Sequence, residues 1–455
     1  MHYLCKMKDK AMRKVLIFIL AVLLPVLPAP AQDFDRWFTG ETLRIDYVFC
    51  GDAQKQAIYL QGLLKTGEWA GRRGRLDETL LRGNGQIRLS DAASGKRLYV
   101  NSFSTLFQEW VSYPEAKQVS RAFENCFQVP FPKKPVDIEI VLTDVHGKVS
   151  ASLKHRVDPS DILIRQVSDN GAPKKALMVG GKSSEAIDIV ILSEGYTDKE
   201  ERKFFRDAKR AQQAIFSHEP FASHADAFNL KAVFVASASS GPSIPHDGQW
   251  HSTMADSHFD TFYSDRYLTS SSQQKIFDAL GTVPFEHIIL LVNTPVYGGG
   301  GIYNSLTIMG SDHPTFAPVL VHEFGHAFGG LGDEYAYDDM EESMYPADTE
   351  PWEPNLTTRV DFGSKWKDMI PAGTPVPTPL DPIETTSDVR RIWSTLSPEQ
   401  KARLNSNVGL YEGGGYQSKG VWRPVQECRM RINECEEFCP VCARAIIRMI
   451  EYYTK

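Results

Sequence analysis

The stretch from Val319 to Tyr335 reads VLVHEFGHAFGGLGDEY and contains the pattern H-E-x-x-H. His322 and His326 are four residues apart, so on a helix they lie one turn apart on the same face and can bind one metal ion. In such sites the glutamate after the first histidine, here Glu323, is not a ligand but a base that takes a proton from a metal-activated water. The alternative is a core helix whose two histidines have ordinary hydrogen-bond partners.

The residues after this helix offer a third ligand. Gly329 and Gly330 interrupt the helical pattern, and Asp333 and Glu334 follow shortly afterwards. A catalytic zinc takes three protein ligands and keeps a fourth position open, so one carboxylate from this pair completes the set. The glycine break and the Asp-Glu pair favour a metal site over a chance match. The stretch therefore predicts a zinc hydrolase site.

Composition narrows the class of protein. The chain has 455 residues, which is enough for two or three domains. Its fractions of hydrophobic (42%) and charged (24%) residues are ordinary for a soluble globular protein. The net charge is -7, and no block of like charges or basic stripe is present. These features argue against nucleic acid and anionic membrane surfaces as partners.

The first 31 residues have the three parts of a secretory signal peptide. Several basic residues precede an apolar run from Val15 to Leu27, and Ala29-Pro30-Ala31 offers a small-x-small cleavage site. A membrane anchor is the weaker alternative, because the run is short and contains Pro25. We therefore expect an exported protein that is secreted, periplasmic or at the cell surface, with no stable membrane insertion after cleavage.

Cysteine usage agrees with export. Cys5 belongs to the signal peptide, and six cysteines remain: Cys50, Cys126, Cys428, Cys435, Cys439 and Cys442. Disulfides are the default outside the cytoplasm, so the last four are expected to pair, with a second, structural zinc as the alternative. Cys50 and Cys126 either bridge the N-terminal domain or are buried free thiols.

The region 33–157 has the pattern of a β-sandwich. Leu43, Ile45, Tyr47 and Phe49 alternate with polar residues, and turn signals separate several such runs. No long helical period occurs. We predict a sandwich of roughly 120 residues that serves as a folding partner or spacer, with a ligand-binding module as the alternative.

The pattern changes in the region 160–455. A nearly continuous apolar strand at 187–192 precedes a helical pattern, and two further buried strands lie at 230–235 and 288–292. This order predicts helices packed on a mixed sheet, with the histidine helix, from His313-Pro314, among them. The predicted fold class is α+β, a β-sandwich followed by a zinc peptidase domain.

Glycines precede the histidine helix. Gly298 to Gly301 lead into an alternating segment that ends at Thr307. Glycines in a strand allow close backbone approach, so this segment is either an edge strand on which an extended peptide lies or a flexible hairpin.

An acidic cluster follows Tyr335. It consists of Asp338, Asp339, Glu341 and Glu342. Such a cluster can hold calcium, but a solvated loop is the preferred interpretation.

Several segments together resemble the IgA-peptidase family of secreted, metzincin-like metallopeptidases. The matching pieces are Ser193-Glu194-Gly195-Tyr196-Thr197, Pro220-Phe221-Ala222, the histidine helix with its Gly-Asp-Glu-Tyr exit, Cys428-Arg429-Met430, and the run from Phe438 to Arg444. They extend from about Ile187 to the end of the chain. The region 33–157 looks like the β-sandwich that often precedes that catalytic domain.

The resemblance implies roles for single residues. His322 and His326 would bind zinc, Glu323 would be the general base, and Met430 would be the Met-turn residue that packs beneath the ligands. The usual third histidine of metzincins falls on Gly332, so Asp333, one residue later, becomes the expected third ligand. Glu334 remains the alternative, either as that ligand or as an acceptor that orients a ligating histidine.

The expected function is a secreted zinc endopeptidase that acts on a protein or peptide substrate. Zinc activates a water, Glu323 takes its proton, and a tyrosine stabilises the carbonyl oxygen, with Tyr303, Tyr335 and Tyr416 as candidates. Two alternatives are a zinc amidohydrolase with a non-peptide substrate and a catalytically silent zinc-containing binding protein. The intact Glu323 argues against the silent protein. The resemblance does not identify the substrate.

Overall fold

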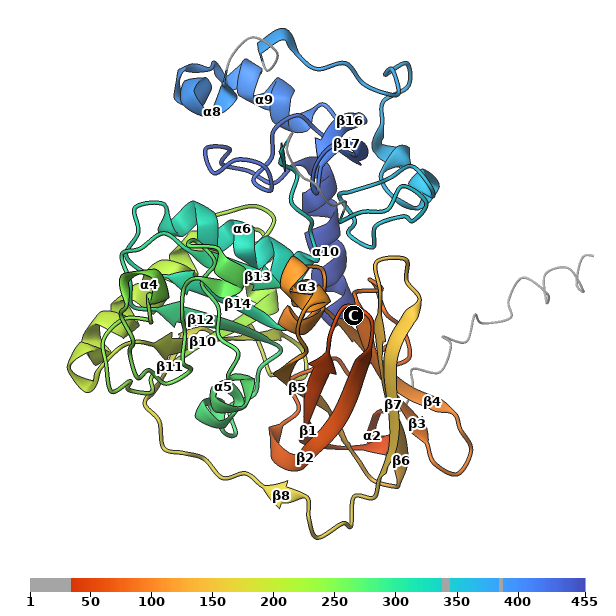
Figure 1. Cartoon of the computed structure of the whole chain (residues 1–455), viewed down its shortest axis with the longest axis vertical. Helices are drawn as coiled ribbons and strands as arrows, with labels where there is room; N and C mark the ends of the chain where they lie inside the picture. The colour runs from red at the N-terminus through yellow and green to blue at the C-terminus, as the bar shows by residue number, and fades with distance from the viewer. Residues whose placement is uncertain (1–33, 338–343, 384–387, 455) are drawn as a thin grey trace, which may run out of the picture.

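The computed structural model describes residues 34–337, 344–383 and 388–454 (Figure 1). The signal peptide predicted over residues 1–31 and the acidic cluster considered for calcium lie outside these ranges. Among the described residues, no helix combines the length and the apolar character needed to cross a bilayer.

The N-terminal part is the predicted β-sandwich, built from two four-stranded sheets. The first sheet has the order β5-β1-β2-β8, with β1 (Phe38–Gly51), β2 (Gln56–Glu68), β5 (Arg121–Pro132) and β8 (Arg165–Gln166). The second has the order β4-β3-β6-β7, with β3 (Gly85–Asp91), β4 (Arg97–Phe103), β6 (Val136–Thr143) and β7 (Val149–Val157). Alternate residues of β3 are buried, as the pattern of a two-layer core requires.

The region after the sandwich, which is the predicted catalytic part, contains the predicted mixed sheet, with the order β13-β14-β12-β10-β11-β9. Its inner strands are parallel: β10 (Ile187–Glu194), β11 (Phe228–Val233), β12 (His287–Val292) and β14 (Leu306–Gly310). Its antiparallel edges are β9 (Lys174–Met178) and β13 (Gly299–Ile302). Every residue of β10 and β12 is buried, which explains their continuous apolar sequence.

Helices pack on both faces of this sheet (Figure 1). They are α4 (Glu201–Phe216), α5 (Gln273–Leu280), α6 (Phe316–Gly329) and α10 (Pro440–Thr454). The histidine helix is α6, and it contacts α4, α10, β13 and β14. It begins at Phe316 and not at the predicted His313-Pro314, because those two residues form a turn in which the Phe316 amide donates to the His313 carbonyl.

A C-terminal segment lies at the top of Figure 1, above α10. It contains α8 (Val389–Ile392), α9 (Pro398–Ser406) and the sheet of β15 (Ala336–Tyr337), β16 (Tyr411–Gly414) and β17 (Tyr416–Arg423). From there α10 runs back to the sandwich, where the Tyr452 hydroxyl donates to the Glu78 carbonyl at 2.7 Å.

The sandwich and the region that follows it are joined by polar contacts. The Arg44 guanidinium, only 2% exposed, donates to Asp46 at 2.7 Å and to Asp278 of α5 at 2.6 Å. The Tyr267 hydroxyl donates at 2.6 Å to Glu109, which belongs to α3 (Leu106–Val111) of the sandwich. The short helix α2 (Phe34–Trp37) leads into β1.

Of the two states considered for Cys50 and Cys126, a bridge and free thiols, the structure has free thiols. On the antiparallel pair β1–β5, Cys50 faces Ala122 and Cys126 faces Asp46. The two cysteines are therefore about 13 Å apart along the strands, whereas a disulfide requires Cα atoms within about 7 Å. Both are free thiols, as are the other four cysteines of the described residues.

Candidate metal centre and cleft

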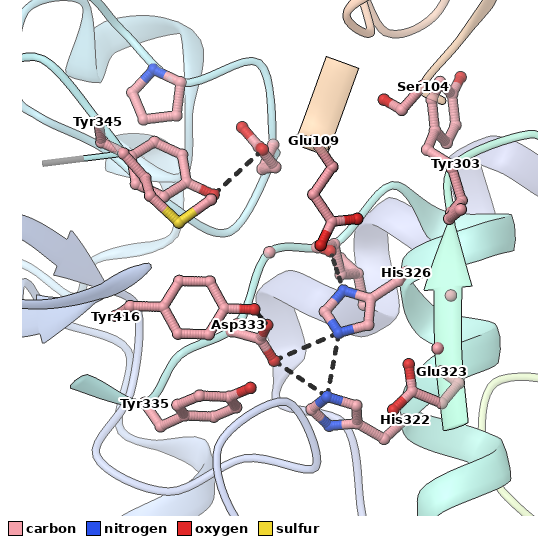
Figure 2. A pocket seen from close by; sticks show the side chains of 18 of the residues that line it. Ser104, Glu109, Tyr303, His322, Glu323, His326, Asp333, Tyr335, Tyr345 and Tyr416 are labelled. Carbon is pink, nitrogen blue, oxygen red and sulfur yellow. Dashed lines mark hydrogen bonds and ion pairs between the residues drawn. The ribbon is translucent and has the colours of Figure 1, made fainter. Parts of the chain in front are cut away.

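Three donors converge at the exit of α6 (Figure 2). The Nε2 atoms of His322 and His326 are 3.0 Å apart. Asp333 Oδ1 lies 3.0 Å from His322 Nε2 and 3.2 Å from His326 Nε2. The helical spacing brings the two imidazoles together, and the turn after α6 brings the carboxylate to them.

Backbone carbonyls fix the tautomer of both histidines. His322 Nδ1 lies 3.0 Å from the Arg429 carbonyl oxygen, and His326 Nδ1 lies 2.6 Å from the Leu331 carbonyl oxygen. A carbonyl only accepts, so each Nδ1 carries a proton, and Nε2 is the nitrogen left to bind a metal. Both Nε2 atoms are thereby directed at one point as metal donors.

The turn after α6 depends on two glycines. Gly330 ends the helix with φ of 62°, a conformation that suits glycine. A Cβ on Gly332 would lie 2.5 Å from Leu356, and its amide donates to Asn355 at 2.8 Å. This close turn carries Asp333 beneath the histidines.

Asp333 is ionised in this setting. Burial alone raises the pKa of its carboxyl, but the adjacent imidazoles of His326 and His322 outweigh that effect and hold the pKa well below its usual range. The Tyr416 hydroxyl donates to Asp333 Oδ2, so that Oδ1 remains directed at the histidines.

Glu334 lies elsewhere, so neither role considered for it fits the structure. Its side chain points to Cys442, whose Sγ is 3.1 Å from Glu334 Oε1, and Asn355 donates to the same oxygen at 2.9 Å. Successive residues of an extended segment point to opposite sides, which separates Glu334 from Asp333. The acceptors that orient the histidines are backbone carbonyls instead.

Met430 lies beneath α6 and is fully buried. A Cβ on Gly325, which stands between the two histidines, would come within 2.9 Å of the Met430 sulfur. The Met430 carbonyl accepts from the Glu334 amide at 2.8 Å. The methionine therefore supports the helix turn that carries the histidines, in the place that a Met-turn residue would take.

Glu323 faces the cleft beside β13. Burial raises the pKa of its carboxyl, whereas the two nearby imidazoles and a hydrogen bond from the Gly301 amide lower it, and burial dominates. A Cβ on Gly301 would lie 2.1 Å from the Glu323 carbonyl oxygen. Strand β13 is thus an antiparallel edge strand that forms a hairpin with β14. Its glycines allow α6 to approach closely.

The three candidate tyrosines are placed differently. The Tyr416 hydroxyl donates to Asp333, as described above. The Tyr335 ring packs against the Tyr416 ring, and the two ring centroids are 5.2 Å apart. Tyr303 lies beyond His326 (Figure 2), with its hydroxyl 3.3 Å from Ser102 Oγ of the sandwich. Tyr335 and Tyr416 therefore remain candidates for an oxyanion contact, whereas Tyr303 belongs to the domain interface.

The donors open into a cleft of about 750 Å³ whose walls come from both domains. The sandwich contributes Glu109, which points toward His326 (Figure 2). The pKa of Glu109 is raised to about 7: burial and the charges of Asp333 and Glu323 raise it, and the hydrogen bond from Tyr267 and the charge of His326 lower it by less. Sequence analysis missed this residue, because a single glutamate in a short amphipathic segment carries no signal.

Comparisons with known proteins agree with this architecture. A family model described as IgA Peptidase M64 matches residues 176–450, and one described as Peptidase M64 N-terminus matches residues 33–154. The two matches cover nearly all of the chain that follows the first 32 residues. No curated protein matches the chain at a significant level.

Proposed function

Because the chain belongs to the IgA peptidase M64 family, we propose that it is an exported, zinc-dependent endopeptidase in which Glu323 is the general base. The observation that carries the proposal is the convergence of His322, His326 and Asp333 on one point beside Glu323. The family itself makes the chain a peptidase with a protein substrate.

The donor set suits zinc. Two neutral imidazoles and one ionised carboxylate make up a three-ligand set of the kind found in catalytic zinc sites. Asp333 is already ionised, whereas burial lowers and the charge of Asp333 raises the pKa of His326, to about 9 overall, so zinc binding displaces one proton from this imidazole. When bound, zinc lowers the pKa of a water to about 7 and polarises a carbonyl oxygen.

The chain's own residues then carry the proton. Glu323 accepts a proton from the attacking water and returns it to the leaving amine. Its raised pKa favours this exchange, since a base works best when its pKa is close to the working pH. We infer that Tyr335, or Tyr416 once its hydroxyl turns away from Asp333, donates a hydrogen bond to the carbonyl oxygen as negative charge develops on it.

The edge strand β13 supports an extended peptide as substrate. It lies against α6, next to the donors, and pairs on one side with β14. Tyr267 forms a single parallel bridge to Gly299 at the other side, so the rest of that edge is the segment on which a peptide can add as a strand.

Two substitutions test the proposal on purified mature protein, with a digest of a whole proteome as substrate. We expect Glu323→Gln to keep its zinc and lose about 10²- to 10⁴-fold in kcat, because it removes the base and no ligand. His322→Ala should lose the ion from this site together with activity.

The matched control is Glu434→Gln, which changes an exposed carboxylate at the rim of the same cleft and should alter neither property. Retention of nearly full activity by Glu323→Gln would remove Glu323 from its proposed role. Loss of zinc by Glu323→Gln would instead make it a ligand.

A further inference from the structure

A second cluster of metal-type donors lies behind the catalytic group. It consists of Glu334, Cys428, Cys439 and Cys442, all fully buried. Their donor atoms all lie within 4.8 Å of one another. Neither the family matches nor the proposed mechanism assigns a role to this cluster.

The spacing of the donors fits tetrahedral coordination. Thiolates bound to one zinc at about 2.3 Å stand about 3.8 Å apart. The sulfur atoms of Cys428 and Cys442 are 3.8 Å apart, and Glu334 Oε1 is 3.1 Å from the Cys442 sulfur. A disulfide needs sulfur atoms about 2.05 Å apart, so the cysteines are arranged around a point and not in a bonded pair.

The backbone is arranged to support thiolates. The Cys439 amide donates to the Cys428 sulfur at 3.2 Å, and the Cys442 amide donates to the Cys439 sulfur at 3.4 Å. Cys439 precedes α10 directly, and Cys442 stands in its first turn. Amide donors and a helix N-terminus both favour the ionised form of a thiol, which is the form that binds metals.

Glu334 supplies an independent observation. Its side chain is fully buried, and its Oε2 has no hydrogen-bond partner among the described residues. An unpaired buried carboxylate oxygen is costly unless a proton or a cation neutralises the group. The carboxylate lies against the Cys442 sulfur, so a cation bound to it would sit among the cysteines.

We propose that Glu334, Cys428, Cys439 and Cys442 bind a second zinc ion with a structural role. Three thiolates and one carboxylate form a closed four-ligand set, which is typical of structural and not of catalytic zinc. Cys435 is not part of the set, because its sulfur lies 3.5 Å from the Asn405 side-chain nitrogen and 3.6 Å from the Glu437 carbonyl oxygen.

This zinc site would hold the catalytic donors in position through the residues next to them in the chain. Glu334 directly follows Asp333 in the chain. Cys428 directly precedes Arg429, whose carbonyl orients His322, and Met430 comes next. An ion that holds Glu334 to Cys428 therefore holds both segments that position the catalytic group.

Metal counting on purified mature protein tests the inference. We expect two zinc ions per chain in the wild type and one in His322→Ala. In the His322→Ala background, the double substitution Cys439→Ser and Cys442→Ser should remove the remaining ion. Cys435→Ser in the same background is the matched control and should retain it.

Measurements that leave the four-residue cluster unsubstituted keep the test decisive if a cysteine variant fails to fold. Cobalt-loaded His322→Ala should show the near-ultraviolet absorption of thiolate bound to cobalt, which nitrogen and oxygen ligands do not give. Alkylation under native conditions should leave the cluster thiols shielded until a chelator is added. A disulfide within the cluster by non-reducing mass spectrometry, or a single zinc ion per wild-type chain that His322→Ala removes, would overturn the inference.

Discussion

At the scale of single residues, Asp333 organises the candidate catalytic group. One of its oxygens faces both histidines, and the other accepts a hydrogen bond from the Tyr416 hydroxyl. Partners of this kind hold a ligand in the orientation that binding needs, so their loss lowers metal affinity without abolishing it.

We therefore expect Tyr416→Phe to weaken zinc binding about 10- to 100-fold, the range typical of residues that orient a ligand. Competition with a chromophoric chelator measures the affinity. Tyr303→Phe removes a hydroxyl that faces Ser102 at the domain interface and should leave the affinity unchanged. If Tyr416→Phe lowers kcat with unchanged zinc affinity, the tyrosine acts on the substrate oxygen and not on Asp333.

At the scale of elements, the contact between α6 and β13 sets the position of Glu323. The glycines of β13 let the strand approach so closely that its backbone meets the helix. The hydrogen bond from the Gly301 amide to the Glu323 carboxylate depends on this distance. The strand is thus a support for the base as well as the edge at which we place the substrate.

A Cβ on Gly301 would lie 2.1 Å from the Glu323 carbonyl oxygen and 3.0 Å from the His326 Cβ. We expect Gly301→Ala to push β13 away from α6, which costs about 1–3 kcal/mol as overpacking and lowers kcat. Thermal unfolding and peptide hydrolysis measure the two effects. Gly181→Ala, whose Cβ would be 3.7 Å from its nearest neighbour, is the control, and equal behaviour of both variants would contradict the argument.

At the scale of the whole molecule, the sandwich is part of the cleft and not only a spacer. Its helix α3 places Glu109 next to the donors, and Tyr267 of the catalytic part holds that carboxyl by a hydrogen bond of 2.6 Å. Glu109 faces Asp333, Glu323 and His326, so its charge is coupled to theirs. Two negatively charged neighbours and burial explain why it holds its proton to near pH 7.

This arrangement predicts that the free energy of unfolding of the metal-stripped protein depends on pH. The pKa of Glu109 rises from an ordinary 4.5 to about 7 on folding, so the folded state binds the proton more tightly. Stability then falls as pH rises from 4.5 to 7, by at most about 3 kcal/mol, and stays constant above that range. Glu109→Gln lacks this titration, so it should gain stability relative to the wild type over that window.

Chemical denaturation at pH 5 and pH 8, with a chelator present, measures the effect. The chelator is needed because a bound cation near Glu109 would stabilise its charged form. Glu139→Gln, a half-exposed glutamate of β6, is the control and should not change the pH profile in this way. Parallel pH profiles for Glu109→Gln and the wild type would show that Glu109 does not titrate in this range.

The features that depend on local spacing could be predicted from the sequence. His322 and His326 share one helix face because the helical period is 3.6 residues, and the alternation in β1 places its apolar side chains on one side of a sheet. The continuous apolar run of β10 likewise indicated a strand buried on both faces. These relations hold before any long-range contact forms.

Relations between distant or competing residues could be read only from the folded chain. Asp333 and Glu334 are adjacent and chemically alike, and the direction of the turn after Gly332 sent one to the histidines and the other to the cysteines. The register of β1 and β5 separated Cys50 from Cys126. Glu109 reached the cleft through domain packing, because the contact lies between segments more than 150 residues apart, and no local pattern records such a contact.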